Sequence, residues 1–233
     1  MRAVHTEPPA DTGERDGLSY ALFLPAETPA GGVVVIHGAG SQKENHFDFA
    51  RACSAAGLAA VAFDQRGHGA SDGALDGRAI DDVATIAALL PDGAPVALRG
   101  SSMGGWLALA AGAALDAAAV VAVCPASGPQ LRRGLDDRRF PFRADPGSLA
   151  PLLETTDLSA AAAALGERLL LMHAEGDEQV PISVSRELHA AAPGSRLIAV
   201  PGGHHRSVQH DPELTAVAVR FLTRVLRPRP ATA

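Results

Sequence analysis

The sequence predicts a doubly wound α/β fold, in which helices cover both faces of a mostly parallel β-sheet. Short apolar runs rich in valine and leucine alternate with longer helical stretches from Gly32 onward. Near-continuous apolar runs are typical of parallel strands that are buried on both faces. Hydrophobic residues make up 47% of the 233 residues and aromatic residues only 4%, so we expect a large aliphatic core. A single domain, residues 1–233, suits a chain of this length.

The strands and helices are predicted in order from these patterns. Segments that are short, apolar and rich in valine and leucine are expected to be strands, the first of them an edge strand. These segments are residues 18–26, 33–37, 58–64, 95–100, 119–125, 169–174 and 196–200. Helices are expected at residues 45–56, 78–90, 103–115, 182–192 and 212–226. This alternation indicates crossover connections between parallel strands.

One connection is too long for a simple crossover. Residues 125–167 span 43 positions, whereas a crossover needs a helix of about 11 residues and two loops of about 2 to 6. The segment mixes leucine and phenylalanine with five arginines. This mixture favours a small lid, at about residues 128–160, over the carboxyl ends of the strands, where open α/β sheets bind ligands. The alternative is an insertion at the protein surface that has no role in function.

A nucleophilic serine is predicted where the strand at 95–100 meets the next helix. Residues Gly100 to Gly104 match G-x-S-x-G with Ser102 at the centre, whereas the neighbouring Ser101 is out of register. A strand, a sharp turn and a helix in this order can hold a serine exposed at the edge of the sheet. The two glycines allow strand and helix to approach closely. The N–H of Met103 would lie at a helix start, where it can stabilise an oxyanion.

A serine hydroxyl needs a base, and the base needs an orienting acid. The strand at 196–200 is followed by Pro201-Gly202-Gly203-His204-His205, and these glycines allow a tight turn back toward the sheet edge. The strand at 169–174 is followed by three acidic residues, Glu175, Asp177 and Glu178. The chain order is therefore serine, acid, histidine. The residues alone leave the choice of histidine open.

The loop after the strand at 33–37 is a candidate for the second oxyanion donor. Its small residues, Gly38-Ala39-Gly40, would let a backbone N–H approach a substrate carbonyl. Ser41 and Glu44 have the spacing of a capping box for the following helix. Phosphate-binding glycine motifs are absent, and no histidines share metal-ligand spacing with a nearby carboxylate, so neither a cofactor nor a metal is expected.

These motifs together resemble the α/β-hydrolase superfamily over nearly the whole chain. The matching stretches are "VVIHGAG", "AFDQRGHGAS", "GSSMGG", "HAEGDEQVP" and "PGGHH". The resemblance is closest to the branch that holds serine aminopeptidase-like hydrolases, monoacylglycerol lipases and small carboxylesterases. It implies Ser102 as nucleophile, Asp177 as acid, His205 as base in a G-x-x-H turn, and Ala39 and Met103 as oxyanion donors. It also implies that a loop with Asp64, Arg66 and His68 braces the site.

The expected activity is that of a serine carboxylesterase acting on short to medium acyl esters through an acyl-enzyme. Lipases of this branch often carry histidine where this chain has Ser101, and their lids are commonly longer, which disfavours long-chain lipid substrates. A serine aminopeptidase or amidase is the alternative enzyme. A non-catalytic binding protein that keeps the fold is the alternative outside enzymes.

Charge and composition limit the partners. The net charge of −6 argues against a nucleic-acid partner, because phosphate binding normally needs a basic face. No apolar run reaches the ~18 residues of a membrane span, and the first residues lack the apolar core of a signal peptide, so a cytoplasmic location is expected. Cys53 and Cys124 are expected to be buried free thiols. A small-molecule ester is the expected ligand, and the oligomeric state is left open.

Overall fold

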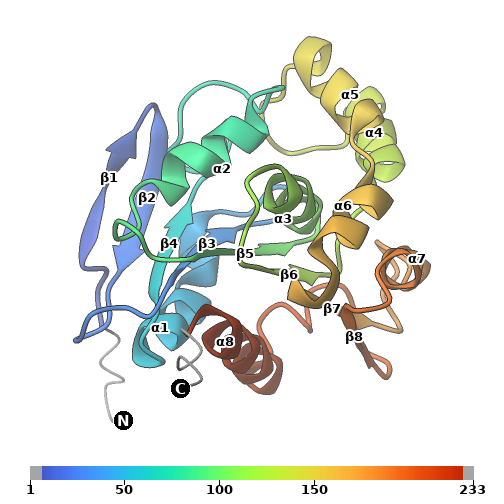
Figure 1. Cartoon of the computed structure of the whole chain (residues 1–233). Coiled ribbons are helices and arrows are strands. Elements are labelled where there is room, and N and C mark those ends of the chain that lie inside the picture. Colours follow the sequence, from blue (N-terminus) through green and yellow to red (C-terminus); the bar gives the residue numbers. More distant parts are fainter. Residues whose placement is uncertain (1–6, 228–233) are drawn as a thin grey trace, which may run out of the picture.

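The computed structural model of the protein describes residues 7–227 and confirms the predicted α/β architecture (Figure 1). Its eight-stranded sheet has the order β1-β2-β4-β3-β5-β6-β7-β8. All pairs from β4 to β8 are parallel, and the pairs β1–β2 and β2–β4 are antiparallel. The strands are β1 (Asp11–Arg15), β2 (Leu18–Phe23), β3 (Gly32–Ile36), β4 (Ala59–Phe63), β5 (Val96–Ser101), β6 (Ala119–Val123), β7 (Leu169–Ala174) and β8 (Arg196–Val200).

Helices cover both faces of this sheet and create two hydrophobic cores (Figure 1). In β3, Val34 and Ile36 join one core while Val33 and Val35 join the other, so alternate residues of an all-apolar strand serve opposite faces. One face is covered by α1 (Phe47–Ala55) and α8 (Pro212–Leu226). The other is covered by α2 (Ala79–Ala87), α3 (Met103–Ala114), α6 (Leu158–Leu165) and α7 (Ser183–Ala191). Two short 3-10 helices, η1 (Lys43–His46) and η2 (Gly166–Arg168), precede α1 and β7.

The prediction that the strand starting at Leu18 lies at the edge of the sheet is wrong, because β1 pairs outside it. All five residues of β1 are exposed and polar or glycine, so the strand has no apolar pattern. It is held by a backbone ladder and by Tyr20, whose hydroxyl donates to Asp11 at 2.9 Å. The turn between the strands is Asp16-Gly17, and both residues have positive φ. An Asp-Gly pair favours a two-residue hairpin turn, and this pair was the feature of the sequence that could have predicted β1.

The long connection between β6 and β7 forms two helices outside the usual crossover, α4 (Gly128–Asp136) and α5 (Pro146–Thr155), before α6 returns to the helix layer. We call residues 128–155 the insertion. Figure 1 shows α4 and α5 side by side beyond α3 and α6. Ser127 and Gln130 form a capping box at the start of α4.

The stretch between α4 and α5 is tied to the loops at the carboxyl edge of the sheet. Leu75 donates to the Arg143 carbonyl at 2.9 Å, and Asp145 donates to the Leu75 carbonyl at 2.8 Å. The ring of Phe142 lies 4.0 Å from that of His68, centre to centre. A Cβ atom built at Gly40 would lie 2.6 Å from Pro141, so the insertion touches the loop after β3. The insertion therefore borders the edge at which the candidate site lies.

Candidate active site

Ser102 lies at a sharp turn between β5 and α3. Its backbone is in an unusual conformation for a residue other than glycine, with φ 55° and ψ −119°. Its N–H donates to the Val123 carbonyl at 2.9 Å, which fixes the turn against β6. A Cβ atom at Gly100 would collide with the carbonyl oxygen of Gly104, and one at Gly104 would collide with that of His37. The two glycines are therefore required for strand and helix to approach.

The two adjacent serines have opposite surroundings. Ser101 is the last residue of β5; it is fully buried, and its hydroxyl has no hydrogen-bond partner among the described residues. Ser102 is partly exposed and lines a cavity of about 450 Å³. Only Ser102 can therefore meet a ligand.

Asp177 and His205 form a buried hydrogen-bonded pair on the loops that follow β7 and β8. His205 Nδ1 lies 2.6 Å from Asp177 Oδ2, and the other carboxylate oxygen accepts from the N–H groups of Gln179 and Val180 at 2.9 Å each. Burial acts to raise the pKa of Asp177. The Val180 N–H and the His205 ring outweigh it, so the pKa lies below its ordinary value. Asp177 is therefore an ionised acceptor for His205.

His204 lies apart from this pair. It is exposed, and its N–H and carbonyl oxygen form a turn with the Ser207 hydroxyl at 2.9 and 2.7 Å. The structure thus brings His205, and not His204, to Asp177. Glu175 and Glu178 are exposed, and Glu175 forms an ion pair with Arg186 at 3.1 Å.

His173 is buried and contacts the loop that carries Asp177. Its Nε2 lies 2.9 Å from the Val180 carbonyl oxygen and 3.4 Å from Asp177 Oδ2, while Nδ1 lies 2.7 Å from the Ser185 hydroxyl. The free thiol of Cys124 is also buried here, and the ligand atoms of Cys124, His173 and Asp177 lie within 4.8 Å of one another. Burial raises the pKa of Cys124 to about 12, so its thiol remains protonated. Sequence spacing did not reveal this cluster, because Cys124 follows β6 whereas His173 and Asp177 lie at the end of β7 and just after it.

The cavity brings together residues from four parts of the chain. Its walls are formed by the loop after β3, the serine turn, the loop after β7 and the loop after β8. The lining residues are Gly38, Ala39, Gly40, Ser41, Asn45, Ser102, Gln179, His205, Arg206, Gln209 and His210. Ser102, His205 and Ala39, which sequence reasoning placed in one site, therefore face one space.

Two backbone N–H groups beside Ser102 are free to donate. Among the hydrogen bonds of residues 7–227, none uses the N–H of Ala39 or of Met103. The Gly38 carbonyl oxygen is contacted by His37 Nδ1 at 2.8 Å and accepts from the Ser41 N–H at 3.1 Å. In a trans peptide the N–H points opposite to the carbonyl, so the N–H of Ala39 points away from His37. A Cβ at Gly38 would lie 3.2 Å from that of Ser102, which shows how closely this loop approaches the serine.

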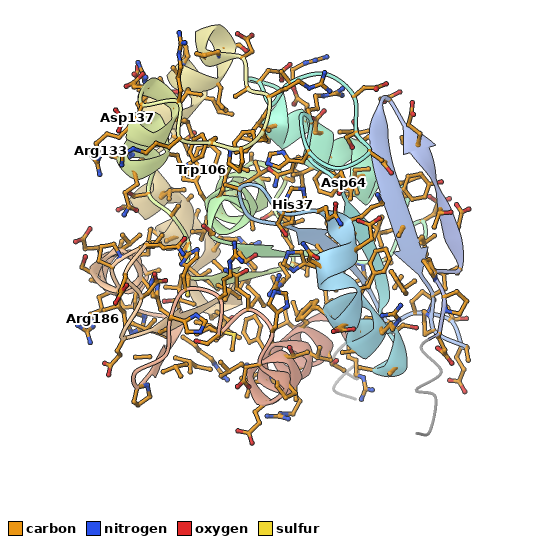
Figure 2. The ribbon with its side chains drawn as sticks, turned by 180° about the vertical axis from the view of Figure 1, so that it is seen from behind. His37, Asp64, Trp106, Arg133, Asp137 and Arg186 are labelled. Carbon is orange, nitrogen blue, oxygen red and sulfur yellow. The ribbon has the colours of Figure 1, made fainter. Side chains whose placement is uncertain are left out.

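The loop after β3 is held by Asp64 and not by the predicted capping box. Ser41 accepts a hydrogen bond from the Asn45 side chain, and Gln42 rather than Ser41 precedes the helix, without a side-chain cap. Asp64 instead accepts from the N–H and the ammonium group of Lys43, both at 2.7 Å. Figure 2 labels Asp64 and His37 at this end of the sheet. A buried ion pair therefore performs the anchoring that the capping box was expected to provide.

The loop that follows β4 braces the same region, as the resemblance implied. The N–H of Gln65 donates to His37 Nε2 at 3.0 Å, and burial lowers the pKa of His37 to about 4, so His37 is neutral. Arg66 forms hydrogen bonds of 2.9 to 3.1 Å with both carboxylate oxygens of Asp82. His68 is buried and contacts the Arg66 carbonyl at 3.1 Å.

Arg99, a residue that sequence reasoning missed, lies behind the cavity wall. It is only 2% exposed although it lies in the middle of β5, and one guanidinium nitrogen donates to the Gln209 carbonyl at 3.1 Å. A second nitrogen lies 3.0 Å from Nδ1 of His46, which is also buried. A charged residue within an otherwise apolar strand was the signal for this arrangement.

Comparison with known protein families gives the site its context. The family described as serine aminopeptidase, S33, a hydrolase family, matches residues 27–144. The chain belongs to this family. The match includes Ala39, Ser102 and Met103, and it ends within the insertion.

Solved structures of other hydrolases share this fold at low sequence identity. Est1E from Butyrivibrio proteoclasticus, in a structure with ferulic acid bound, is 20% identical with a TM-score of 0.70, covering 93% of this chain and 99% of that one. A monoacylglycerol lipase from Paleococcus ferrophilus is 22% identical with a TM-score of 0.69, covering 90% and 98%. The esterase Pf2001 from Pyrococcus furiosus is 20% identical with a TM-score of 0.72, covering 93% and 92%. These similarities confirm the α/β-hydrolase fold of this family member.

A curated relative is much longer than this chain. An uncharacterized abhydrolase domain-containing protein of Dictyostelium discoideum is 32% identical over an alignment of 104 residues, and the match covers 42% of this chain and 11% of that protein. In the described part of this hydrolase, no helix is long and apolar enough to cross a membrane.

Proposed function

We propose that the protein is a serine carboxylesterase with Ser102 as nucleophile, His205 as base, Asp177 as acid, and Ala39 and Met103 as oxyanion donors. The observation that carries the proposal is the 2.6 Å contact between His205 and an ionised Asp177, with His205 lining the same cavity as Ser102. Ser102, Asp177 and His205 follow β5, β7 and β8, whose carboxyl ends lie at one edge of the sheet, which supports this assignment. The chain order of serine, acid and histidine is that of α/β-hydrolases.

The proposed reaction follows from this arrangement. Ser102 Oγ bonds to the ester carbonyl carbon while His205 Nε2 takes the hydroxyl proton, and the carbonyl oxygen becomes an oxyanion held by the two N–H groups. The bond to the leaving alcohol then breaks, and His205 returns its proton to that oxygen. Water attacks the acyl-enzyme by the same route and releases the acid and Ser102. Asp177 orients the ring of His205 and stabilises its charged form.

The cavity favours esters over the free amino termini that an aminopeptidase binds. An aminopeptidase needs an anionic group for the substrate ammonium, yet no aspartate or glutamate is among the described residues that line the cavity. Glu175 instead pairs with Arg186, which Figure 2 shows at the outer surface. An aminopeptidase is therefore the weaker proposal. A binding protein without activity is weaker still, because ligand binding alone does not require an ionised Asp177 in contact with His205.

The insertion limits the space for the acyl group. Between the insertion and the start of α3 lies an apolar pocket of only about 10 Å³, lined by Met103 and by side chains of the insertion such as Leu131 and Phe140. Trp106, which also lines it, is labelled in the interior of Figure 2, whereas Arg133 and Asp137 lie on the outer surface of the insertion. We propose that the insertion acts as a lid that closes this side of the site. A long acyl chain would have to displace it.

The proposed activity is tested with a chromogenic acyl ester and a fluorophosphonate. We expect release of 4-nitrophenol from 4-nitrophenyl butyrate and a single covalent adduct on Ser102, located by mass spectrometry of the digested protein. The adduct forms because the phosphonyl group mimics the tetrahedral intermediate in the same oxyanion site. Heat-unfolded protein is the control and should not be labelled. Native protein that neither turns over the ester nor reacts would leave only the binding-protein alternative.

The acyl preference tests the role of the insertion. In a series of 4-nitrophenyl esters from acetate to hexadecanoate, kcat/KM should peak at short to medium chains. Each buried CH₂ contributes only about 0.8 kcal/mol, and only while it fits. A kcat/KM that keeps rising to hexadecanoate would contradict a closed insertion and favour a lipase.

A further inference from the structure

The wall of the candidate site covers a buried cation that has no carboxylate partner. The guanidinium of Arg99 contacts His46 and the Gln209 carbonyl, lies 4.9 Å above the ring of Phe49, and leaves its Nε without a partner. Arg99 takes part in none of the ion pairs of residues 7–227, so no described aspartate or glutamate oxygen lies within 4.0 Å of its guanidinium nitrogens. Burial lowers the pKa of Arg99 to about 10, so the group remains charged at neutral pH.

A buried charge of this kind raises the free energy of the folded protein, and its electrostatic potential extends far through the interior. Removing a cation from water costs several kcal/mol unless an opposite charge compensates it. In a medium of low dielectric constant its field is also screened less than that of a surface charge. The neutral contacts of Arg99 satisfy two of its nitrogens but leave its charge uncompensated. The region around it should therefore attract an anion.

Two residues that line the cavity lie close to Arg99, so its positive potential extends to the cavity wall. Gln209, whose carbonyl accepts from Arg99, lines the cavity, and so does His210, whose ring stacks on that of His46 at 5.6 Å between centres. Burial lowers the pKa of His210, the charges of Arg99 and Arg206 lower it further, and the charge of Asp48 opposes them only in part. Both arginines thus act on one wall of the cavity.

Arg206 offers the direct contact that Arg99 cannot. It follows His205, is exposed, lines the cavity, and forms no ion pair with a described carboxylate. No aspartate or glutamate is among the described residues that line the cavity; of the acidic groups around it, Asp177 holds His205, and Asp48 pairs with Arg51 at 3.3 Å. In a chain with a net charge of −6, the site is therefore locally cationic.

The position of this charge relative to the proposed base indicates which half of an ester it would meet. His205 must return its proton to the leaving oxygen, so the leaving alcohol faces His205. Arg206, Gln209 and His210 are on the same loop and line the same cavity. The acyl half would instead point toward Met103 and the insertion. The cationic wall therefore borders the alcohol half.

We propose that the preferred substrate is an ester whose alcohol or phenol half carries a carboxylate, bound by Arg206 beside His210 in the field of Arg99. This inference rests on the proposed esterase activity and adds its substrate class. Arg206 would make a charge-assisted contact with the carboxylate. Arg99 would act at a distance, as a positioning residue for Gln209 and as a source of positive potential.

The test compares 4-acetoxybenzoate with its methyl ester, which differ in the charge of the leaving phenol. The measured quantity is the ratio of their kcat/KM values, corrected for their rates with hydroxide. Wild type should prefer the carboxylate on the order of tenfold, the effect expected of one charge-assisted hydrogen bond. In Arg206→Gln the ratio should fall toward one. Arg220→Gln, an exposed arginine of α8 outside the cavity, is the matched control and should keep the wild-type ratio.

A second pair of esters locates the charge. 4-Nitrophenyl hydrogen adipate and 4-nitrophenyl hexanoate differ by a carboxylate in the acyl half, and their ratio should not depend on Arg206. If Arg206→Gln changed this ratio and not the first, the assignment to the alcohol half would be overturned. Turnover of both acetoxybenzoates with no preference for the carboxylate would overturn the inference but keep the esterase. Turnover of no ester, together with an unlabelled Ser102, would remove the proposed function itself.

Discussion

Replacing Ser102 by alanine should lower kcat for ester hydrolysis on the order of 10⁶-fold, the effect of removing a triad nucleophile. The residual rate would come from the free N–H groups of Ala39 and Met103, which remain in place. The measurement is release of 4-nitrophenol under saturating substrate. Circular dichroism should show an unchanged fold, because alanine has the same backbone requirements at φ 55° as serine.

Ser101→Ala is the matched control. The Ser101 hydroxyl is fully buried and has no hydrogen-bond partner, so its removal breaks no described contact. This variant should retain most of the wild-type kcat. An inactive Ser101→Ala beside an active Ser102→Ala would show that the serines had been assigned in the wrong register.

Replacing His205 by alanine should remove nearly all turnover and, with it, the acid limb of the pH–rate profile. A triad base must be neutral to accept the serine proton, so kcat/KM should show an acid limb only in a protein that keeps this base. Asp177 does not produce this limb, because its pKa is lowered and it is already ionised in that range. The measurement is kcat/KM against pH for wild type and variant.

His204→Ala should keep both the acid limb and most of the rate. Its side chain is exposed, and its contacts with Ser207 use only backbone atoms that alanine also has. An inactive His204→Ala beside an active His205→Ala would reverse the assignment of the base and would contradict the 2.6 Å contact with Asp177 as the catalytic one.

The sheet and the serine turn could be predicted because their causes are local in the sequence. Continuous apolar runs predict the parallel strands from β3 to β8, and small residues two positions before and after Ser102 are a steric requirement that the Gly100 and Gly104 contacts confirm. Asp177 and His205 follow strands that end at the same sheet edge, so topology brings them together. The residue pattern alone did not distinguish His204 from His205; that choice came from the family resemblance.

The remaining features depend on partners far apart in the sequence. The exposed strand β1 has no apolar pattern and forms only because β2 offers a free edge. The loop after β3 is anchored by Asp64, 21 residues from Lys43, rather than by the local capping box. Arg99 and His46 lie 53 residues apart, and their burial together leaves no local signal beyond one charge in an apolar strand. Spacing along the chain does not reveal such pairs.

The anchoring of the loop after β3 has a consequence for native-state proteolysis. Lys43 is the only lysine of the chain, and its ammonium group is buried with Asp64. A protease specific for lysyl bonds therefore has a single bond to cut, and that bond is protected as long as the loop is in place. Cleavage requires the ion pair to open, so its rate under native conditions reports the local unfolding of the segment that carries Ala39. The rate at which two fragments appear therefore measures how often the segment that carries Ala39 unfolds locally.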